Sequence, residues 1–237
     1  MTMPYSFAFQ PVIDTDQERV VAYEALVRGT QDEPAHTVLQ QFKGNDLLRF
    51  DGEARLQALS LAAKLGLNCQ LSLNILPASL ELNPRVLEQT LACADEVGVD
   101  AEELIIEISE TEIIAQPELF ANRIASIQAA GVRFSFDDFG AGYSGLNLLA
   151  EYQPHTIKLD RIIVQDIHKR GPRQAIVRGV LGACTDLGID VVAEGVESIE
   201  EYQWLSDAGI SRFQGYLFSK PIFEKLPVPV FPDQKPR

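Results

Sequence analysis

Two adjacent carboxylates, Asp137 and Asp138, end an apolar run that begins near Phe134 and is followed by a glycine-containing loop up to residue 144. Like charges side by side repel each other and are costly to remove from water unless a cation accompanies them. A divalent metal is such a partner, and loops that follow strands are where sites are commonly built. A solvated turn is the alternative for this dipeptide alone. The pair therefore predicts a metal site only if other elements supply further ligands.

Alternation along the apolar runs places the other candidate residues on one common face. In the run 132–138, Phe134 and Phe136 share the face that packs on helices, whereas Asp137 lies on the opposite face. Asp138 has the wrong parity and can join Asp137 only at the rim, where the pleat relaxes. The inward-facing set of the other runs, with Leu26 as its apolar member, is Gln10, Glu24, Leu26, Arg28, Asn74, Glu107, Lys158, Asp160, Glu194 and Gln214. Any one could be a satisfied core group, but their convergence near the carboxyl ends of eight runs predicts a site at a barrel rim.

The carboxylates of this set, together with Asn74 and Asp138, offer oxygen atoms as ligands, and oxygen ligands suit Mg²⁺ or Mn²⁺ rather than zinc. The histidines at positions 36, 155 and 168 show no metal-ligand spacing. A buried Lys158 beside such a site is suited to orienting a water molecule or stabilising phosphate charge, and a structural salt bridge is the alternative. The candidate metal ligands are Glu24, Asn74, Glu107, Asp137 and Asp138.

Eight β-type runs alternate with segments of helical period. The runs cover 6–13, 20–28, 70–76, 103–109, 132–138, 155–160, 189–195 and 211–218, and the helical segments cover 53–65, 117–130, 173–187 and 199–208. This order is typical of an α/β fold and predicts a (β/α)8 TIM-type barrel rather than an open sheet. Only about six residues separate the first two runs, too few for a helical crossover, so we expect an antiparallel hairpin. The barrel should cover about residues 5–222 of a single domain, 1–237, with 223–237 as an irregular tail.

The composition describes a globular chain of 237 residues whose 20 Lys+Arg and 34 Asp+Glu give a formal charge of −14. This balance argues against a DNA or RNA polymer or an anionic membrane as partner, but not against a phosphate substrate, because metals held by carboxylates reverse the local field. Three widely spaced cysteines suit a reducing cytosol. No signal-peptide pattern and no run of about 18 apolar residues occurs, so we expect a cytoplasmic protein.

The chain carries a series of short motifs: 9–11 FQP, 23–28 YEALVR, 73–74 LN, 107–110 EISE, 137–144 DDFGAGYS, 157–160 IKLD, 193–197 AEGVE and 214–221 QGYLFSKP. In residues and in order they resemble those of one known family, the EAL-domain phosphodiesterases of bacterial cyclic di-GMP signalling. Residues 23–28 correspond to the motif that names this family. The resemblance covers roughly residues 5–222 and is highly specific, because many multi-residue motifs agree in order.

The resemblance implies a modified barrel with an antiparallel first strand that hydrolyses cyclic di-GMP to linear pGpG, using two divalent cations, Mg²⁺ or Mn²⁺. It assigns one metal to Glu24, Asn74, Glu107 and Asp137, and it makes Asp137 a bridge to a second metal beside Asp138. Ca²⁺ is expected to inhibit, because its larger and looser coordination misplaces the water.

The same resemblance implies roles for the remaining residues. Lys158 and Glu194 match the residues that position or activate the attacking water, and Gln214 lies near it. The matches to substrate contacts are Gln10, Leu26, Arg28 and Asp160. Glu110 matches the residue that steadies the loop after Asp138, a loop that is linked to formation of a homodimer.

The sequence departs from the family pattern at few positions. Ala141 stands where Thr is common, and Gly29 follows Arg28 where Trp is frequent. The segment 29–50 is shorter than usual and is similar to that of EAL modules attached to flavin-based blue-light sensors, although no such sensor fits in this sequence. These departures concern the contacts to guanine and the regulation of the domain.

Two other functions stay open. A degenerate EAL domain can serve as a non-hydrolysing cyclic di-GMP receptor or as a protein-interaction module, but degenerate members lack metal ligands or the base, which are present here. An unrelated metal-dependent barrel enzyme would need a different pocket, and the motifs around Arg28 and Gln214 argue against it. We therefore expect an active phosphodiesterase, and a regulatory partner acting in trans stays open.

Overall fold

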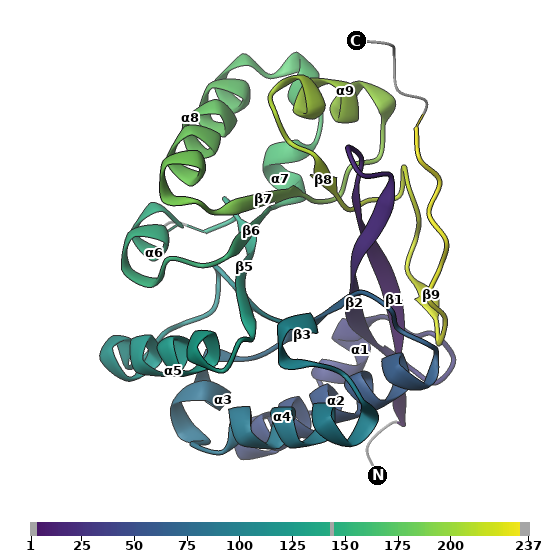
Figure 1. Ribbon diagram of the computed structural model, residues 1–237, viewed down its shortest axis with the longest axis vertical. Coiled ribbons are helices and arrows are strands. Elements are labelled where there is room, and N and C mark those ends of the chain that lie inside the picture. The colour runs from purple at the N-terminus through teal and green to yellow at the C-terminus, as the bar shows by residue number, and fades with distance from the viewer. Residues whose placement is uncertain (1–3, 143–144, 233–237) are drawn as a thin grey trace.

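The barrel begins with an antiparallel hairpin. Strands β1 (Tyr5–Asp14) and β2 (Arg19–Gly29) pair along their whole lengths, with Gln10 opposite Glu24. The hairpin arises because the turn between the strands is too short for a helix. The computed structural model describes residues 4–142 and 145–232, and Figure 1 shows the hairpin on one side of the barrel.

Six parallel strands follow β2 in chain order and return to β1. They are β3 (Gln70–Asn74), β4 (Leu104–Ser109), β5 (Arg133–Phe139), β6 (Thr156–Leu159), β7 (Asp190–Ala193) and β8 (Arg212–Phe213). Because β1 pairs antiparallel with both β2 and β8, the sheet closes into an eight-stranded barrel. The predicted TIM-type barrel with an antiparallel first strand is confirmed.

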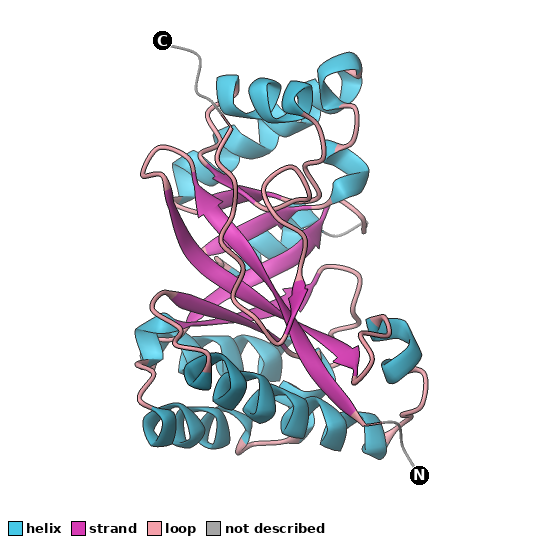
Figure 2. Ribbon diagram, turned by 90° about the vertical axis from the view of Figure 1, so that its right-hand side faces the viewer, coloured by secondary structure: helices cyan, strands magenta, loops and turns pink. Residues whose placement is uncertain are grey.

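Helices cover the outside of this barrel (Figures 1 and 2). They are α1 (Ala35–Leu39), α2 (Asn45–Lys64), α3 (Pro77–Leu82), α4 (Val86–Val97), α5 (Pro117–Ala129), α6 (Gly145–Tyr152), α7 (Arg161–Val164), α8 (Gly171–Leu187) and α9 (Ile199–Asp207), with 3₁₀ turns η1 (Ala101–Glu103) and η2 (Ile167–Lys169). Within the described residues, none of them is both long enough and apolar enough to span a bilayer.

The sequence predicted four of these helices and missed the others. The helix expected over 53–65 begins at Asn45, because burial of Phe50 outweighs the weak helix propensity of Gly52. Helices α1, α3, α6 and α7 have eight residues or fewer, too short for a clear helical period. The run expected over 211–218 is a strand only at Arg212–Phe213.

The segment that follows β8 runs along the β1–β2 hairpin. The tail expected to be irregular from residue 223 includes part of a short strand, β9 (Ile222–Phe223), which pairs antiparallel with β1. Farther on, the hydroxyl of Tyr23 donates to the carbonyl oxygen of Pro227 at 2.9 Å. In Figure 1 this segment, in yellow, runs beside β1.

The barrel interior is layered. A small apolar cluster of Val12, Ala22, Ile105 and Val192 fills one level. All four belong to the inward parity of their strands, and the polar residues of the predicted site follow them toward the carboxyl ends of the parallel strands. The main core lies between the outward faces of the strands and the helices, where Phe134 and Phe136 are fully buried. The residues of the predicted site therefore gather at one end of the barrel, next to this apolar level.

Candidate active site

Lys158 lies at the centre of a buried group of carboxylates. Its Nζ is 3.0 Å from Glu24 Oε2 and 3.0 Å from Glu107 Oε2. The same atom is 3.2 Å from Asp137 Oδ1 and 2.5 Å from Glu194 Oε1. Each partner comes from a different strand or from the residue after it, so the closed barrel brings together groups that are far apart in the chain.

One ammonium group does not balance this many acids. Burial raises the pKa of Glu107 to about 8, and Glu24 and Asp137 add to the rise although Lys158 opposes it. Burial and Asp137 likewise hold the pKa of Glu194 well above its usual range. Burial alone would lower the pKa of Lys158, but the four carboxylates keep it well above its ordinary value. The site is therefore short of positive charge, as expected of a site for a cation.

The Asp137–Asp138 pair lies where the regular pleat ends. The register between β5 and β6 shifts between Phe136 and Phe139, so the pair falls in the irregular stretch. Asp138 has a φ of 55°, a left-handed conformation that non-glycine residues adopt at a cost, and its N–H donates to Asp137 Oδ1 at 2.9 Å. This departure from alternation lets both carboxylates serve one site, as expected if the pleat relaxes at the rim.

Two overlapping sets of carboxylates fit a metal ion by chemistry and spacing. One oxygen each from Glu24, Glu107 and Asp137 lie within 4.8 Å of one another, and so do oxygens from Asp137, Asp138 and Glu194. Asp137 belongs to both sets. These hard oxygen donors suit Mg²⁺ or Mn²⁺.

Amide side chains complete the wall around Glu24. Asn74 Nδ2 donates to Glu24 Oε1 at 3.3 Å, and Gln214 Nε2 donates to Glu24 Oε2 at 2.8 Å. Gln214 Nε2 also lies 3.4 Å from Gln10 Oε1, and Gln10 Nε2 donates to the carbonyl of Ser219 at 3.1 Å. Gln214 Oε1 is buried without a partner in the described part of the chain. It is therefore an acceptor available to water or ligand.

Three of the predicted substrate contacts lie outside the carboxylate group. Leu26 lines a neighbouring cavity. Arg28 Nη1 donates to the carbonyl of Val27 at 2.8 Å, and its Nε is 3.7 Å from Asp32. Asp160 caps α7, because its Oδ1 accepts from the N–H of Ile162 at 2.7 Å. Their roles as substrate contacts stay predictions.

The end of β4 holds the loop after Asp138. Glu110 Oε2 accepts from the backbone N–H groups of Gly140 at 2.6 Å and Gly142 at 3.3 Å. Ser109, which was not among the predicted site residues, donates from Oγ to Asp138 Oδ2 at 2.9 Å. Ser109 shares the parity of Glu107, so the alternation could have revealed it. Residues 143–144 of the expected rim loop lie outside the described residues.

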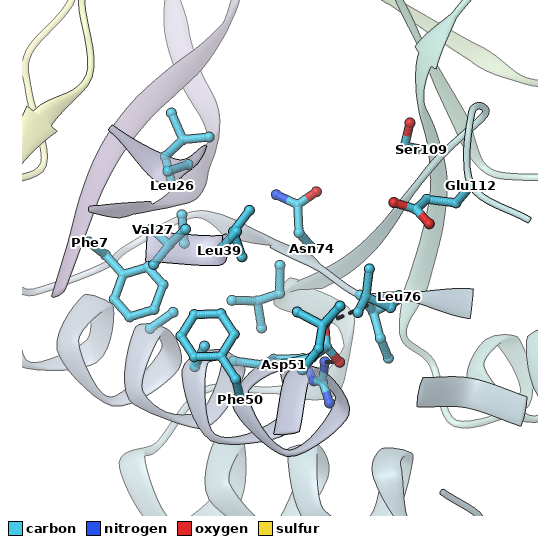
Figure 3. Close-up of a pocket in the computed structure, with 18 residues that line it drawn as sticks. Phe7, Leu26, Val27, Leu39, Phe50, Asp51, Asn74, Leu76, Ser109 and Glu112 are labelled. Carbon is cyan, nitrogen blue, oxygen red and sulfur yellow. Dashed lines mark hydrogen bonds and ion pairs between the residues drawn. The ribbon is translucent and has the colours of Figure 1, made fainter. Parts of the chain in front are cut away.

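A cavity of about 380 Å³ lies beside the carboxylates (Figure 3). Leu26, Asn74 and Ser109 line it on the side of the site, and Phe7 and Phe50 contribute to its apolar wall. Its charged lining residues include Asp51 and Arg55 of α2. Asn74 thus belongs both to the carboxylate site and to this cavity.

A family model described as EAL domain matches residues 5–221. The chain belongs to the EAL domain family. It is 36% identical over 230 residues to the blue light- and temperature-regulated antirepressor BluF of Escherichia coli K12, covering 97% of this chain and 57% of that protein. It is 35% identical over 164 residues to the cyclic di-GMP phosphodiesterase RocR of Pseudomonas aeruginosa, covering 69% of this chain and 41% of that protein. The chain therefore spans less than two thirds of the length of these curated relatives.

Solved EAL structures have the same fold. A standalone EAL protein from Vibrio cholerae O395 in a cyclic di-GMP-bound form matches with a TM-score of 0.92 and 37% identity, covering 97% of both chains. The manganese and cyclic di-GMP complex of Klebsiella pneumoniae BlrP1 at pH 9.0 matches with a TM-score of 0.91 and 39% identity, covering 97% of this chain and 60% of that one. A calcium and cyclic di-GMP complex of BlrP1 matches with a TM-score of 0.90. The expected likeness to EAL modules of blue-light-regulated proteins is confirmed by BluF.

Proposed function

We propose that this chain is a metal-dependent phosphodiesterase that hydrolyses cyclic di-GMP to linear pGpG. The observation that carries the proposal is the pair of oxygen-ligand sets that share Asp137 around Lys158. The similarity to RocR and to EAL proteins that bind cyclic di-GMP supports the substrate. A phosphodiester carries a negative charge that repels a nucleophile, so an acidic site of this kind needs bound cations to act on it.

The residues divide into cation ligands and water-handling groups. Glu24, Asn74, Glu107 and Asp137 would hold one divalent cation, and Asp137 with Asp138 would hold a second. When bound, the cations supply Lewis-acid activation of water and neutralise phosphate charge. Glu194 is suited to accept the proton of the attacking water at its carboxylate, and Lys158 Nζ orients that water by donating to it. Gln214 Oε1 offers a buried acceptor for the same water.

Substrate recognition falls to residues on either side of this centre. Gln10, Leu26, Arg28 and Asp160 are the proposed contacts, and Arg28 supplies a guanidinium for a phosphate or a guanine edge. In the structure Arg28 lies against Asp32 at 3.7 Å with its side chain 18% exposed, so it has to exchange this weak partner for substrate.

Mg²⁺ or Mn²⁺ is the proposed activator, and Ca²⁺ the proposed inhibitor. Calcium accepts more ligands at longer distances than magnesium, so it occupies the carboxylates while leaving the water badly placed. The manganese and calcium complexes of BlrP1 both contain cyclic di-GMP, which supports binding of substrate with either ion. The rate of turnover with each ion distinguishes an activator from an inhibitor.

A direct assay tests the function. Purified protein is incubated with cyclic di-GMP and Mg²⁺ or Mn²⁺, and the nucleotides are separated by chromatography. We expect linear pGpG, no product with Ca²⁺ alone, and no product from the Glu24→Ala variant, which lacks a ligand of the first cation. Tight binding of cyclic di-GMP without pGpG would instead identify a receptor.

The second candidate is the non-hydrolysing receptor or protein-interaction module. It is favoured by one observation, the 36% identity to BluF, whose name describes an antirepressor. The full set of proposed ligands and the presence of Lys158 and Glu194 favour the enzyme. A regulatory partner that acts in trans is compatible with either function.

Assembly and location are part of the proposal. Glu110 fixes the loop at Gly140 and Gly142, and we infer that this loop couples the site to a homodimer interface. All three cysteines are free, which fits a reducing compartment, and we place the protein in the cytoplasm. A Glu110→Ala variant that keeps both full activity and normal dimerisation would contradict the proposed coupling.

A further inference from the structure

A buried ion pair on α2 lies directly beneath the rim of the barrel. Arg55 Nη1 is 2.9 Å from Asp51 Oδ2, and the two side chains are 2% and 10% exposed. Arg55 Nε also donates to Thr90 Oγ1 of α4 at 3.2 Å. The pair is therefore fixed to a second helix and is nearly out of contact with water.

The second oxygen of Asp51 reaches the backbone of the rim. Asp51 Oδ1 accepts from the N–H of Leu76 at 3.2 Å, a bond drawn as a dashed line in Figure 3. Leu76 stands two residues after Asn74, the last residue of β3. Between them, the N–H of Ile75 donates to the carbonyl of Glu107 at 3.0 Å. The backbone after Asn74 is thus held from two sides, by β4 and by α2.

Stability alone is a weak reason for this pair. Removing two charges from water costs several kcal/mol per ion, and well-packed apolar residues in their place are often neutral or stabilising. Asp51 and Arg55 also line a cavity whose other walls include Phe7, Phe50 and Leu26, where apolar side chains would fit. Apolar side chains at these two positions could not accept a hydrogen bond from the N–H of Leu76.

We propose that Asp51 is a positioning residue for Asn74. By fixing Leu76 N–H it sets the direction in which the chain leaves β3, and so it holds the Asn74 side chain against Glu24 in the wall of the cation site. The inference rests on the proposed function, because Asn74 matters there as a cation ligand. Arg55 supplies the counter-charge to this carboxylate, at 2.9 Å. Groups that hydrogen-bond to metal ligands and orient them commonly change metal affinity about 10–100-fold when they are removed.

The test measures Mn²⁺ binding by calorimetry, without substrate. The double variant Asp51→Ala with Arg55→Met removes the ion pair and the bond to Leu76 but leaves no unpaired buried charge. We expect it to stay folded and to bind Mn²⁺ about tenfold more weakly. Asp51→Asn keeps an oxygen that can accept from Leu76 N–H, so its Mn²⁺ affinity should stay within about twofold of the wild type.

A matched control separates positioning from general stability. Glu81, 6% exposed, uses Oε1 to accept from the backbone N–H of Gln116 at 2.8 Å, the same kind of bond at the start of another helix. We expect Glu81→Ala to lower the unfolding temperature and to leave Mn²⁺ affinity unchanged. An effect of Glu81→Ala on affinity as large as that of the double variant would overturn the inference.

Combination with Asn74→Ala shows whether Asp51 acts through Asn74. If it does, adding the double change to Asn74→Ala causes no further loss of Mn²⁺ affinity, because the positioned group is already absent. Any of three results would refute the proposal. These are losses of Mn²⁺ affinity that multiply in the combined variant, wild-type affinity in the folded double variant, and a tenfold loss of affinity in Asp51→Asn. Failure of the wild type to bind Mn²⁺ would instead overturn the proposed function.

Discussion

Lys158 donates hydrogen bonds to Glu24 and Glu107 and forms ion pairs with Asp137 and Glu194, and with a side-chain exposure of 2% it has no water to replace them. It serves two purposes that conflict in the absence of metal. It neutralises part of the acidic cluster, and in the proposed reaction it has to donate to a water molecule. Bound cations resolve the conflict, because they take over the neutralisation of the carboxylates.

We expect Lys158→Met to lower the free energy of unfolding of the metal-free protein by about 3–5 kcal/mol, the usual loss when one partner of a buried pair is removed. In Mn²⁺ the loss should be smaller, since the cation replaces the missing charge. Turnover should fall by about 10²-fold or more, as for loss of a preorganised hydrogen-bond donor at a reacting centre. Urea unfolding in EDTA and in Mn²⁺ measures the first effect, and the nucleotide assay measures the second.

Lys169→Met is the control for this variant. Its side chain is 69% exposed, so both stability and turnover should stay near the wild type, within about 0.5 kcal/mol for stability. Equal destabilisation of Lys158→Met with and without Mn²⁺ would contradict the view that lysine and cation share the same carboxylates.

Among the elements, the segment after β8 packs closely on the backbone of Val196. Gly215 follows Gln214, and a Cβ on Gly215 would overlap the backbone oxygen and nitrogen of Val196. That backbone cannot move freely, because Val196 N–H donates to the carbonyl of Gln214 at 3.2 Å and its carbonyl accepts from Leu217 N–H at 3.1 Å. The absence of a side chain at Gly215 therefore places Gln214 beside Glu24.

We predict that Gly215→Ala lowers the free energy of unfolding by about 1–3 kcal/mol through overpacking and lowers turnover by displacing Gln214. Gly179→Ala, on the exposed surface of α8, meets no atom within 4 Å and should raise stability by about 0.5–1 kcal/mol through helix propensity. Thermal unfolding and the nucleotide assay measure both variants. A Gly215→Ala protein as stable and active as the wild type would show that the backbone around Val196 yields easily.

A second element-scale feature joins β5 to the start of β6. The ring nitrogen Nδ1 of His155 accepts from the N–H of Phe134 at 3.1 Å, which requires this nitrogen to be unprotonated. Burial, and then the charge of Arg133, lower the pKa of His155. His155 therefore binds a proton less readily in the folded state than in the unfolded chain, which takes it up near pH 6.5. The contribution of His155 to stability is complete above that pH and is lost as the pH falls through the lower, folded-state pKa.

Between pH 7.5 and pH 5.5, protonation of His155 lowers the unfolding temperature, whereas the carboxyls of Glu107 and Glu194, whose pKa values are raised, act in the opposite direction. In His155→Ala the His155 component disappears, so on acidification over this range the unfolding temperature falls less, or rises more, than in the wild type, although the variant is less stable at pH 7.5. His36→Ala, at an exposed position of α1, should keep the wild-type slope. An unchanged slope in His155→Ala would show that protonation of this ring is not linked to folding.

At the scale of the whole molecule, cation binding and folding are linked. The ligands of the proposed site come from β2, β3, β4 and β5, so the site exists only in the closed barrel. A cation that binds the folded chain alone stabilises it by about 2.7 kcal/mol at a hundred times its dissociation constant. The formal charge of −14 strengthens this effect, because bound cations also reduce the repulsion within an acidic protein.

We expect EDTA to lower the unfolding temperature and Mg²⁺, Mn²⁺ or Ca²⁺ to restore it, whereas only Mg²⁺ and Mn²⁺ restore turnover. Thermal unfolding over a series of metal concentrations measures the first effect. In Glu24→Ala the dependence on metal should weaken, since one ligand set loses a member. An unfolding temperature independent of metal in the wild type would contradict the proposed site.

The sequence by itself determined the family, the barrel and the residues that face its axis. Strand alternation is a local property, so parity placed Glu24, Glu107 and Lys158 on the inward face without any knowledge of their neighbours. The short turn before β2 likewise predicted the antiparallel first strand. Short helices such as α1 and α7 were missed, because four or five residues carry no readable period.

Only the tertiary structure decided which of these groups touch. The convergence of four carboxylates on one ammonium depends on how the strands tilt and close, which no local pattern encodes. The same holds for Asp51, which looks like an ordinary helical residue until α2 packs beneath β3 and brings its oxygen 3.2 Å from Leu76 N. Side-chain direction along one element follows from its period, whereas distances between elements follow from packing of the whole chain.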